Sequence, residues 1–295
     1  MMPPQHILDG CDATGSITDG FSLEVTVRDI EGLKNVAPQI PAGTVIAIPC
    51  LAQDKVRSRV EVAQMVRDLG FAPMPHLSAR RIASTAELEE FLTRSIDLAG
   101  ADRCLVVAGD VAIPVGPFAD SAAIIESGIF EHAGMKIVGV SGHPEGHAVM
   151  NEAQCWSVLE SKCREIAHRR MTPMIVTQFA FDEDCILSWL RTLRARGIEH
   201  PVRIGVPGPA SMATLTRFAV RCGIETSASL LAKRGKSLGK LLGTGGPDRF
   251  VRRLEAGLGK EHGAVRLHFY LFGGIAQTVD WIERYRGQKF RLGQQ

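Results

Sequence analysis

Short apolar runs rich in β-branched residues recur along this chain of 295 residues, and segments with helical spacing separate most of them. In residues 84–100 the apolar residues share one helical face, and Ser84 with Glu87 forms a capping box at the start. This alternation predicts strands connected by helices. The predicted strands are residues 21–27, 44–50, 73–78, 103–110, 136–142, 174–181, 202–208 and 267–273.

Runs that are apolar on both faces suit parallel strands covered by helices, and eight strand–helix units in roughly 250 residues are typical of a closed barrel. We therefore predict a (β/α)8 TIM barrel of class α/β that forms a single domain over residues 1–295, with residues 1–18 as a flexible extension. A doubly wound open sheet is the competing interpretation. Polar residues near the carboxyl ends of the runs favour the barrel, because barrel enzymes keep their sites there. These residues are Glu24, Cys50, His76, Asp110, His143, Gln178, Pro207 and Tyr270.

The composition narrows the partner classes. Lysine and arginine total 34 against 32 acidic residues, a net charge of +2, which argues against nucleic acid or membrane lipid as the main partner and favours a small molecule or a protein. The seven cysteines are odd in number, widely spaced and without a CxxC pair, as in reduced thiols. No secretory leader pattern or apolar run of about 18 residues occurs, so we expect a cytoplasmic protein with no membrane segment.

Residues 143–147, "HPEGH", follow an apolar run directly. His143 and His147 are four residues apart, as in helix-borne metal ligands, but Pro144 disfavours the helical region for His143. A helical zinc site is therefore excluded. A metal site in a loop and a purely structural histidine pair remain alternatives. At the mouth of a barrel, two imidazoles in a glycine-flanked turn suit the edge of a planar, polar ligand better, so we predict no metal.

Three polar residues interrupt apolar stretches, and each has two interpretations. Asp110 is a helix N-cap or a buried functional acid. Glu24 faces outward from its strand, or it lies in a low-dielectric site that favours its protonated form and suits a general acid. Gln178 is a core amide bonded to the backbone or a partner for a heterocycle. Serine hydrolases and Schiff-base aldolases are not indicated, because there is no GxSxG motif and no strand ends on lysine.

Several short segments follow one another along the chain in a recognisable order. They are Glu24, "PHLS" at 75–78, "GD" at 109–110, "HPEGH" at 143–147, "TQFAFD" at 177–182, "VPGP" at 206–209 and "HFY" at 268–270. Their order resembles that of the methylenetetrahydrofolate reductase family, over roughly residues 20–272 and in the short form that is a lone catalytic barrel. The resemblance implies a flavoprotein that uses FAD to interconvert 5,10-methylenetetrahydrofolate and 5-methyltetrahydrofolate in one-carbon metabolism.

The same resemblance implies roles for individual residues. Glu24 matches the acid that protonates N10 of the folate, and Asp110 matches the aspartate near both flavin and pterin. Gln178 and Phe218 match the amide and the aromatic ring that bind folate. The positions that match contacts to FAD, with two candidates for its pyrophosphate at the end, are Ala52, His76, Gly109, Asp110, His143, His147, Lys162 and Arg164.

The chain also departs from the family pattern. Ala108 stands where the family usually has an arginine. Cys50 lies in residues 49–51, "PCL", where the family commonly has "TYG". Gly274 stands where the family has an arginine that contacts folate. These changes leave the electron donor open, with NADH and NADPH as candidates. Two alternatives follow: a flavin-free folate reductase that uses NADH directly, and a pterin-binding or methyl-carrier barrel with no redox role. Association into a homo-oligomer is also left open.

Overall fold

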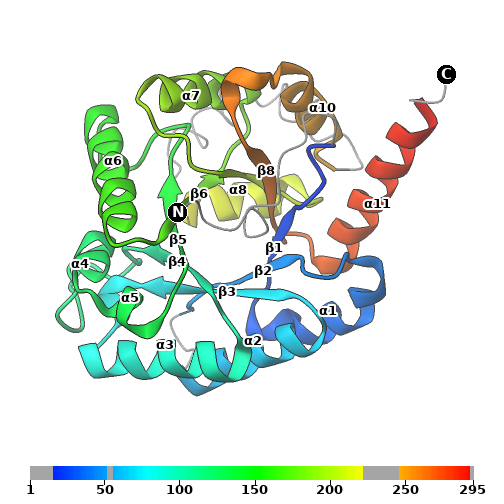
Figure 1. The fold of residues 1–295 in the computed structure, drawn as a ribbon. Helices are drawn as coiled ribbons and strands as arrows, with labels where there is room; N and C mark the ends of the chain where they lie inside the picture. The colour runs from blue at the N-terminus through cyan, green and yellow to red at the C-terminus, as the bar shows by residue number, and fades with distance from the viewer. Residues whose placement is uncertain (1–15, 52–55, 222–245, 293–295) are drawn as a thin grey trace. The chain divides into compact units, whose positions relative to one another are not determined.

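The computed structural model describes residues 16–51, 56–221 and 246–292. Its strands β1 to β8 form a closed barrel in sequence order, and the paired strands are parallel (Figure 1). The predicted barrel is confirmed, and the alternative of an open sheet is wrong. Every predicted strand corresponds to one in the barrel: β1 Ser22–Glu24, β2 Val45–Ile48, β3 Ala72–Ser78, β4 Arg103–Val107, β5 Ile137–Gly142, β6 Thr172–Phe179, β7 Val202–Pro207 and β8 Val265–Tyr270.

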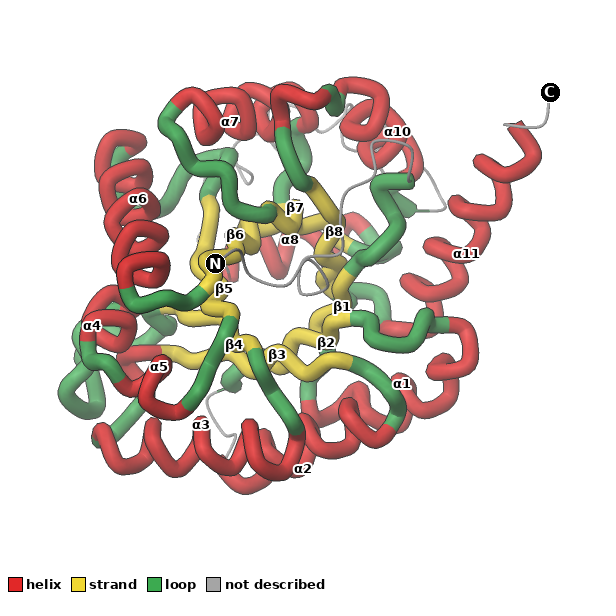
Figure 2. The backbone as a smooth tube through the Cα atoms, in the orientation of Figure 1, coloured by secondary structure: helices red, strands yellow, loops and turns green. Residues whose placement is uncertain are grey.

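Helices connect successive strands, as Figure 2 shows in red. The first connection begins early, because Thr26 donates its backbone N–H and its hydroxyl to the carboxylate of Asp29 and caps a short 3-10 turn. Strand β1 is therefore only 3 residues long. The helices described are α1 Ile30–Val36, α2 Val56–Asp68, α3 Thr85–Ala99, α4 Ser121–Glu126, α5 Ile129–Ala133, α6 Glu152–His168, α7 Glu183–Ala195, α8 Met212–Arg221, α10 Asp248–Gly257 and α11 Ile275–Leu292.

The chain divides into two compact units. The first unit comprises Ser22–Gly142 and Trp156–Val176, and the second comprises Met1–Phe21, His143–Cys155 and Thr177–Gln295. The prediction of a single domain therefore stays a prediction, and each unit is described by itself.

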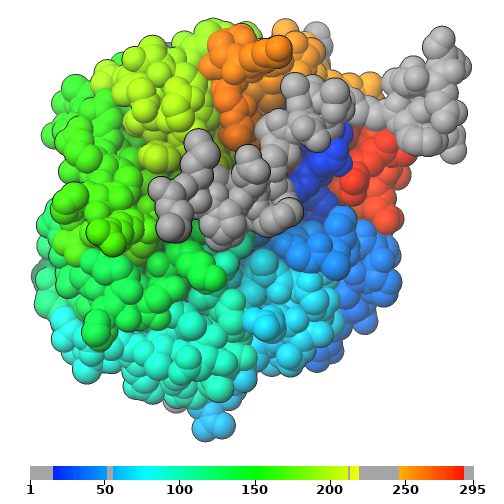
Figure 3. All heavy atoms as spheres, viewed as in Figure 1, coloured from blue at the N-terminus to red at the C-terminus, as the bar shows by residue number. Residues whose placement is uncertain are grey.

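In the first unit, helices α2 and α3 lie side by side outside the strands (Figures 1 and 2), and Figure 3 shows the side chains of α3, in cyan, on the outer surface. Half of the capping box predicted for α3 is present: the Ser84 hydroxyl accepts the N–H of Glu87 at 3.1 Å, whereas the carboxylate of Glu87 accepts the N–H of Ala83 instead of that of Ser84. Gly100 ends the helix with a φ of 59°, a left-handed conformation that glycine adopts without a Cβ penalty. Burial of Leu88, Phe91 and Leu92 then fixes this helix against the barrel.

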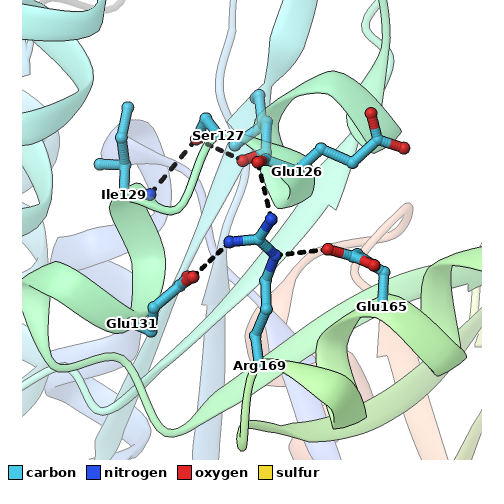
Figure 4. A network of polar contacts seen from close by, with 7 residues as sticks. Glu126, Ser127, Ile129, Glu131, Glu165 and Arg169 are labelled. Carbon is cyan, nitrogen blue, oxygen red and sulfur yellow. Dashed lines mark hydrogen bonds and ion pairs between the residues drawn. The ribbon is translucent and has the colours of Figure 1, made fainter.

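A polar network also stabilises the first unit (Figure 4). Arg169, directly after α6, donates Nε to Glu165 at 2.6 Å, Nη1 to Glu131 and Nη2 to the backbone oxygen of Glu126 at 2.8 Å. The Ser127 hydroxyl donates to the carbonyl of Ile124 and accepts the N–H of Ile129, which connects α4 to α5. One guanidinium therefore links α6 to both short helices.

In the second unit, β7 and β8 pair along their whole lengths, from Val202 opposite Val265 to Pro207 opposite Tyr270. Residues 16–18 belong to this packing, because the N–H of Ile17 donates to Glu255 of α10 at 3.0 Å and Thr18 is fully buried. The prediction of a flexible extension is therefore wrong for residues 16–18, where a buried side chain and an acceptor on α10 hold the segment. Residues 1–15 lie outside the described residues.

Candidate functional site

Glu24 is the last residue of β1 and lies opposite Ala47 of β2 in the parallel register. Its side chain is half-buried, whereas its neighbours Leu23 and Val25 are fully buried. The carboxyl ends of β1 to β4 lie at the same edge of this unit, because consecutive strands in it are parallel. Glu24 therefore lies at the edge where a barrel keeps its chemistry.

Asp110 lies beyond the end of β4, in an environment that differs from both the helix N-cap and the buried site that the sequence suggested. Its Oδ1 accepts hydrogen bonds from Nε and Nη2 of Arg81 at 2.9 and 2.6 Å, and 76% of its side chain is exposed. It is not an N-cap either, since Asp120 caps the next helix, α4, by accepting the N–H groups of Ala122 and Ala123. The expected burial and the expected N-cap are therefore wrong, because Asp110 lies in a loop where Arg81 from the preceding loop reaches it; its functional role stays a prediction.

Gly109 has a conformation that only glycine adopts easily. Its φ is +93°, and a Cβ at this position would lie 3.3 Å from Cβ of Ser78 on β3. His76 and Ser78 are both buried at the carboxyl end of β3, and the backbone oxygen of His76 accepts a hydrogen bond from Arg59 of α2. The ends of β3 and β4 therefore approach each other closely around Gly109.

The two predicted pyrophosphate contacts of α6 do not share a helix face. Lys162 is half-buried and Arg164 is exposed, because two positions along an α-helix differ by about 200° in direction. Burial lowers the pKa of Lys162, and the nearby carboxylate of Asp120 and thiol of Cys163 offset part of that effect. Of the pair, Lys162 is the more buried side chain. Ala52 lies outside the described residues.

The segment "HPEGH" forms a turn in the second unit. The N–H of Gly146 donates to the carbonyl of His143 at 3.1 Å, and Gly146 has a φ of +92°. The rings of His143 and His147 are edge to face, with centroids 4.7 Å apart. The non-helical conformation predicted for His143 is confirmed. Within residues 16–51, 56–221 and 246–292, no group of three or more His, Cys, Asp or Glu side chains could hold a metal ion.

Glu145, in the middle of this turn, is a residue that the sequence patterns do not single out. Its Oε1 accepts the backbone N–H groups of Phe181 and Asp182, both at 2.8 Å. The thiol of Cys185 on α7 donates to the carbonyl of Pro144 at 3.1 Å. These contacts attach the histidine turn to the start of α7. No local pattern could have predicted them, because Glu145 lies 36 residues before Phe181.

Gln178 and Phe218 belong to another part of the second unit. Gln178, at the end of β6, is half-buried and its Oε1 accepts the N–H of Phe179 at 3.0 Å. Its amide oxygen is therefore bonded to backbone, and its predicted role as a partner for a heterocycle stays a prediction. The half-buried ring of Phe218 on α8 stacks on Phe272, with centroids 4.2 Å apart and an interplanar angle of 15°. The two rings belong to an aromatic cluster made up of Phe179, Phe181, Phe218, Tyr270 and Phe272.

Comparison with known proteins identifies the family. The family Methylenetetrahydrofolate reductase matches residues 30–240 of this sequence. The chain belongs to the methylenetetrahydrofolate reductase family. The predicted resemblance is thus confirmed over more than half of the chain, including β2 to β7 and the residues from His76 to Phe218.

Solved structures with little sequence identity share its barrel fold. One is a Clostridium thermocellum protein, uncharacterized, that binds two copies of 5-methyl-5,6,7,8-tetrahydrofolic acid; it has a TM-score of 0.56 and 11% identity, with 90% of this chain and 93% of that chain covered. Another is dihydropteroate synthase from Thermus thermophilus, with a TM-score of 0.50, 14% identity and the same coverage. At these identities the likeness shows the fold alone. None of the described helices is long and apolar enough to cross a membrane.

Proposed function

We propose that this protein is a flavin-dependent oxidoreductase that interconverts 5,10-methylenetetrahydrofolate and 5-methyltetrahydrofolate. The observation that carries the proposal is the family match together with a half-buried carboxyl group, Glu24, at the carboxyl end of β1. The family match supports the class of reaction. The position of Glu24 at the carboxyl end of a strand, where barrel enzymes perform their chemistry, supports its role as the acid.

The residues at the strand ends fit a cofactor such as FAD. Gly109 brings backbone close to Ser78 where a Cβ would crowd the loop, and glycine is the usual residue where backbone approaches a ligand. Imidazole groups from His76, His143 and His147 are suitable hydrogen-bonding partners for a polar heterocycle, and Lys162 is a cation suited to phosphate. When bound, FAD supplies the hydride acceptor and donor of the reaction.

The chain's own contribution in this proposal is proton transfer and electrostatics. Glu24 donates a proton to N10 of the folate, which opens the five-membered ring to a cationic iminium at N5. The carboxylate of Asp110 stabilises that positive charge once Arg81 releases it. Gln178 contributes an amide for the pterin edge, and the ring of Phe218 packs against the ligand.

The absorption spectrum of the purified protein tests this function. We expect a flavin spectrum, either as isolated or after incubation with FAD, and we expect it to bleach when 5-methyltetrahydrofolate is added without oxygen. A protein that stays colourless but oxidises NADH with methylenetetrahydrofolate would be a flavin-free reductase instead. Folate binding without any electron transfer would indicate a pterin-binding or methyl-carrier protein. Either result would overturn the proposal.

A further inference from the structure

Three aromatic rings in the second unit lie nearly parallel to one another. Phe272, in the loop after β8, stacks on Phe218 of α8 with centroids 4.2 Å apart and an interplanar angle of 15°. The same ring stacks on Tyr270, the last residue of β8, with centroids 5.7 Å apart and an angle of 23°. Phe179 of β6 packs edge to face against Phe272 at 4.9 Å and against Tyr270 at 5.5 Å. Phe272 therefore connects the aromatic side chains of the strands to that of α8.

The backbone around Phe272 fixes the position of its ring. The next residue, Gly273, lies so near the loop after β7 that a Cβ on it would be 1.8 Å from the carbonyl oxygen of Pro209, and only glycine allows this approach. Gly274 follows with a φ of +100°, in the left-handed region that glycine tolerates. The N–H of Phe272 donates to the carbonyl of Tyr270 at 2.9 Å. This turn holds Phe272 close to the end of its strand, where it meets α8.

The stack has a buried end and a partly exposed end. Phe179 is 1% exposed, and the hydroxyl of Tyr270 donates to the carbonyl of Thr177 at 3.2 Å. Phe218 and Phe272 are only half-buried. The exposed area of these two rings is apolar surface that an aromatic ring of a ligand can cover, with a gain from both burial and stacking.

The contact with Phe272 also removes a cost of ligand binding. A half-exposed phenylalanine on a helix can change its side-chain rotamer, and ordering such a side chain when a ligand binds reduces the affinity. Because Phe218 is stacked on Phe272, its ring is already ordered in the protein without ligand. A ring that is ordered beforehand gives more affinity for the same contact area.

We propose that Phe272 is a positioning residue for the substrate: it holds the ring of Phe218 in one orientation, in which that ring packs on the aromatic ring of the ligand's side chain. The inference rests on the proposed function in taking tetrahydrofolate as the ligand, whose aminobenzoyl ring is linked to the pterin. It goes beyond that function by assigning a role to Phe272 and to the two glycines that place it, since Gly274 stands where the family has an arginine.

Isothermal titration calorimetry of the full chain with folic acid tests the proposal, because folic acid carries the same side chain and cannot donate a hydride. We expect Phe272→Leu to weaken binding by about three- to tenfold, the range expected for loss of an aromatic pair. Phe272→Tyr should keep the affinity, because it keeps the stacked ring. If Phe272 acts through Phe218, the double variant Phe218→Leu/Phe272→Leu should bind no more weakly than Phe218→Leu alone.

The matched control is Phe181→Leu. Phe181 belongs to the same cluster and packs edge to face on Phe179 with centroids 5.7 Å apart, outside the stack. This substitution should lower the free energy of unfolding and leave the affinity for folic acid unchanged. Equal losses of affinity in Phe181→Leu and Phe272→Leu would show that any damage to the cluster weakens binding, and would overturn the positioning role.

A second ligand locates the effect of Phe272. The affinity for 6-methylpterin, which lacks the aminobenzoyl ring, should be the same in Phe272→Leu and in the unmodified protein. An equal loss of affinity for both ligands, additive losses in the double variant, or no heat of binding with folic acid in the unmodified protein would each overturn the inference. These titrations involve no electron transfer, so a protein that binds folic acid as described and never bleaches flavin would overturn the proposed reaction alone.

Discussion

Glu145 accepts the backbone N–H of Asp182 at 2.8 Å, while the carboxylate of Asp182 accepts the N–H groups of Asp184 and Cys185, both at 3.1 Å. The carboxylate of Glu145 thus binds the backbone of the loop before α7, and the carboxylate of Asp182 caps the first turn of that helix. Through this contact the turn that bears His143 and His147 is attached to the helix.

Replacing Glu145 with alanine removes the acceptor of two backbone N–H groups. Since hydrogen bonds to charged groups contribute about 1.5–3 kcal/mol each and the two share one oxygen, we expect Glu145→Ala to lower the free energy of unfolding by about 2–3 kcal/mol. Urea denaturation measures this. The control is Glu89→Ala on the exposed face of α3, which should change the value by no more than about 0.5 kcal/mol. Equal effects of the two substitutions would contradict the role of Glu145.

Asp110→Asn separates a functional role from a structural one. The ion pair with Arg81 is largely exposed and Asp110 caps no helix, so we expect a change in stability below about 1 kcal/mol. The folate step should be impaired while FAD remains bound, because the carboxylate that stabilises the iminium is lost. Thermal unfolding and single-turnover kinetics check the two parts. A variant that fails to fold would show that Asp110 is structural.

Much of the fold could be predicted from the sequence, and the reasons are local. An apolar run such as residues 136–142 predicts strand β5 because both of its faces are covered, and the capping interaction of Ser84 marks the start of α3. The strand predicted over residues 21–27 is longer than β1, because the capping box of Thr26 ends β1 early. These features could be predicted because each depends on residues that are close together in the sequence.

Residues of the candidate site that depend on contacts between distant loops could not be predicted. Arg81 lies 29 residues before its partner Asp110, and Phe272 stacks on Phe218 from another element. Neither contact leaves a periodic signal in the sequence. The order of Glu24, Asp110 and Gln178 could be recognised because family resemblance, rather than spacing, connects them.

Arg169→Gln tests the network of Figure 4. It removes the partner of Glu131 and Glu165, and Oε2 of Glu131 is buried without a hydrogen-bond partner among the described residues. Because a partly buried acid then loses its cation, we expect the free energy of unfolding to fall by about 1–3 kcal/mol. The control Arg94→Gln breaks only an exposed pair with Glu90 on α3 and should cost no more than about 0.5 kcal/mol. Urea denaturation of both variants decides whether the network stabilises the unit.

Because the thiol of Cys163 is buried, we predict that the protein loses stability at alkaline pH. Burial raises the pKa of its thiol from 9.0 to about 12, partly offset by the charge of Lys162. The folded state holds the thiol proton more tightly than the unfolded state does. The protonated thiol therefore makes its full contribution to the free energy of unfolding below pH 9, and as the pH rises to about 12 this contribution falls by up to about 4 kcal/mol. The stability difference between the unmodified protein and Cys163→Ala should therefore shrink over this range. A constant difference would show that burial does not govern the thiol.

The rate at which 5-methyltetrahydrofolate bleaches bound FAD in Glu24→Gln tests the central claim most directly, because this half-reaction needs the carboxyl group at the end of β1. We expect bleaching in anaerobic stopped-flow to slow by about 10²- to 10⁴-fold relative to the unmodified protein, the usual cost of losing a general acid or base. Flavin reduction by NADH or NADPH, measured on the same samples, should be largely unchanged wherever it occurs. An unchanged rate of bleaching by the folate, or an equal loss in both half-reactions, would contradict the assignment of Glu24.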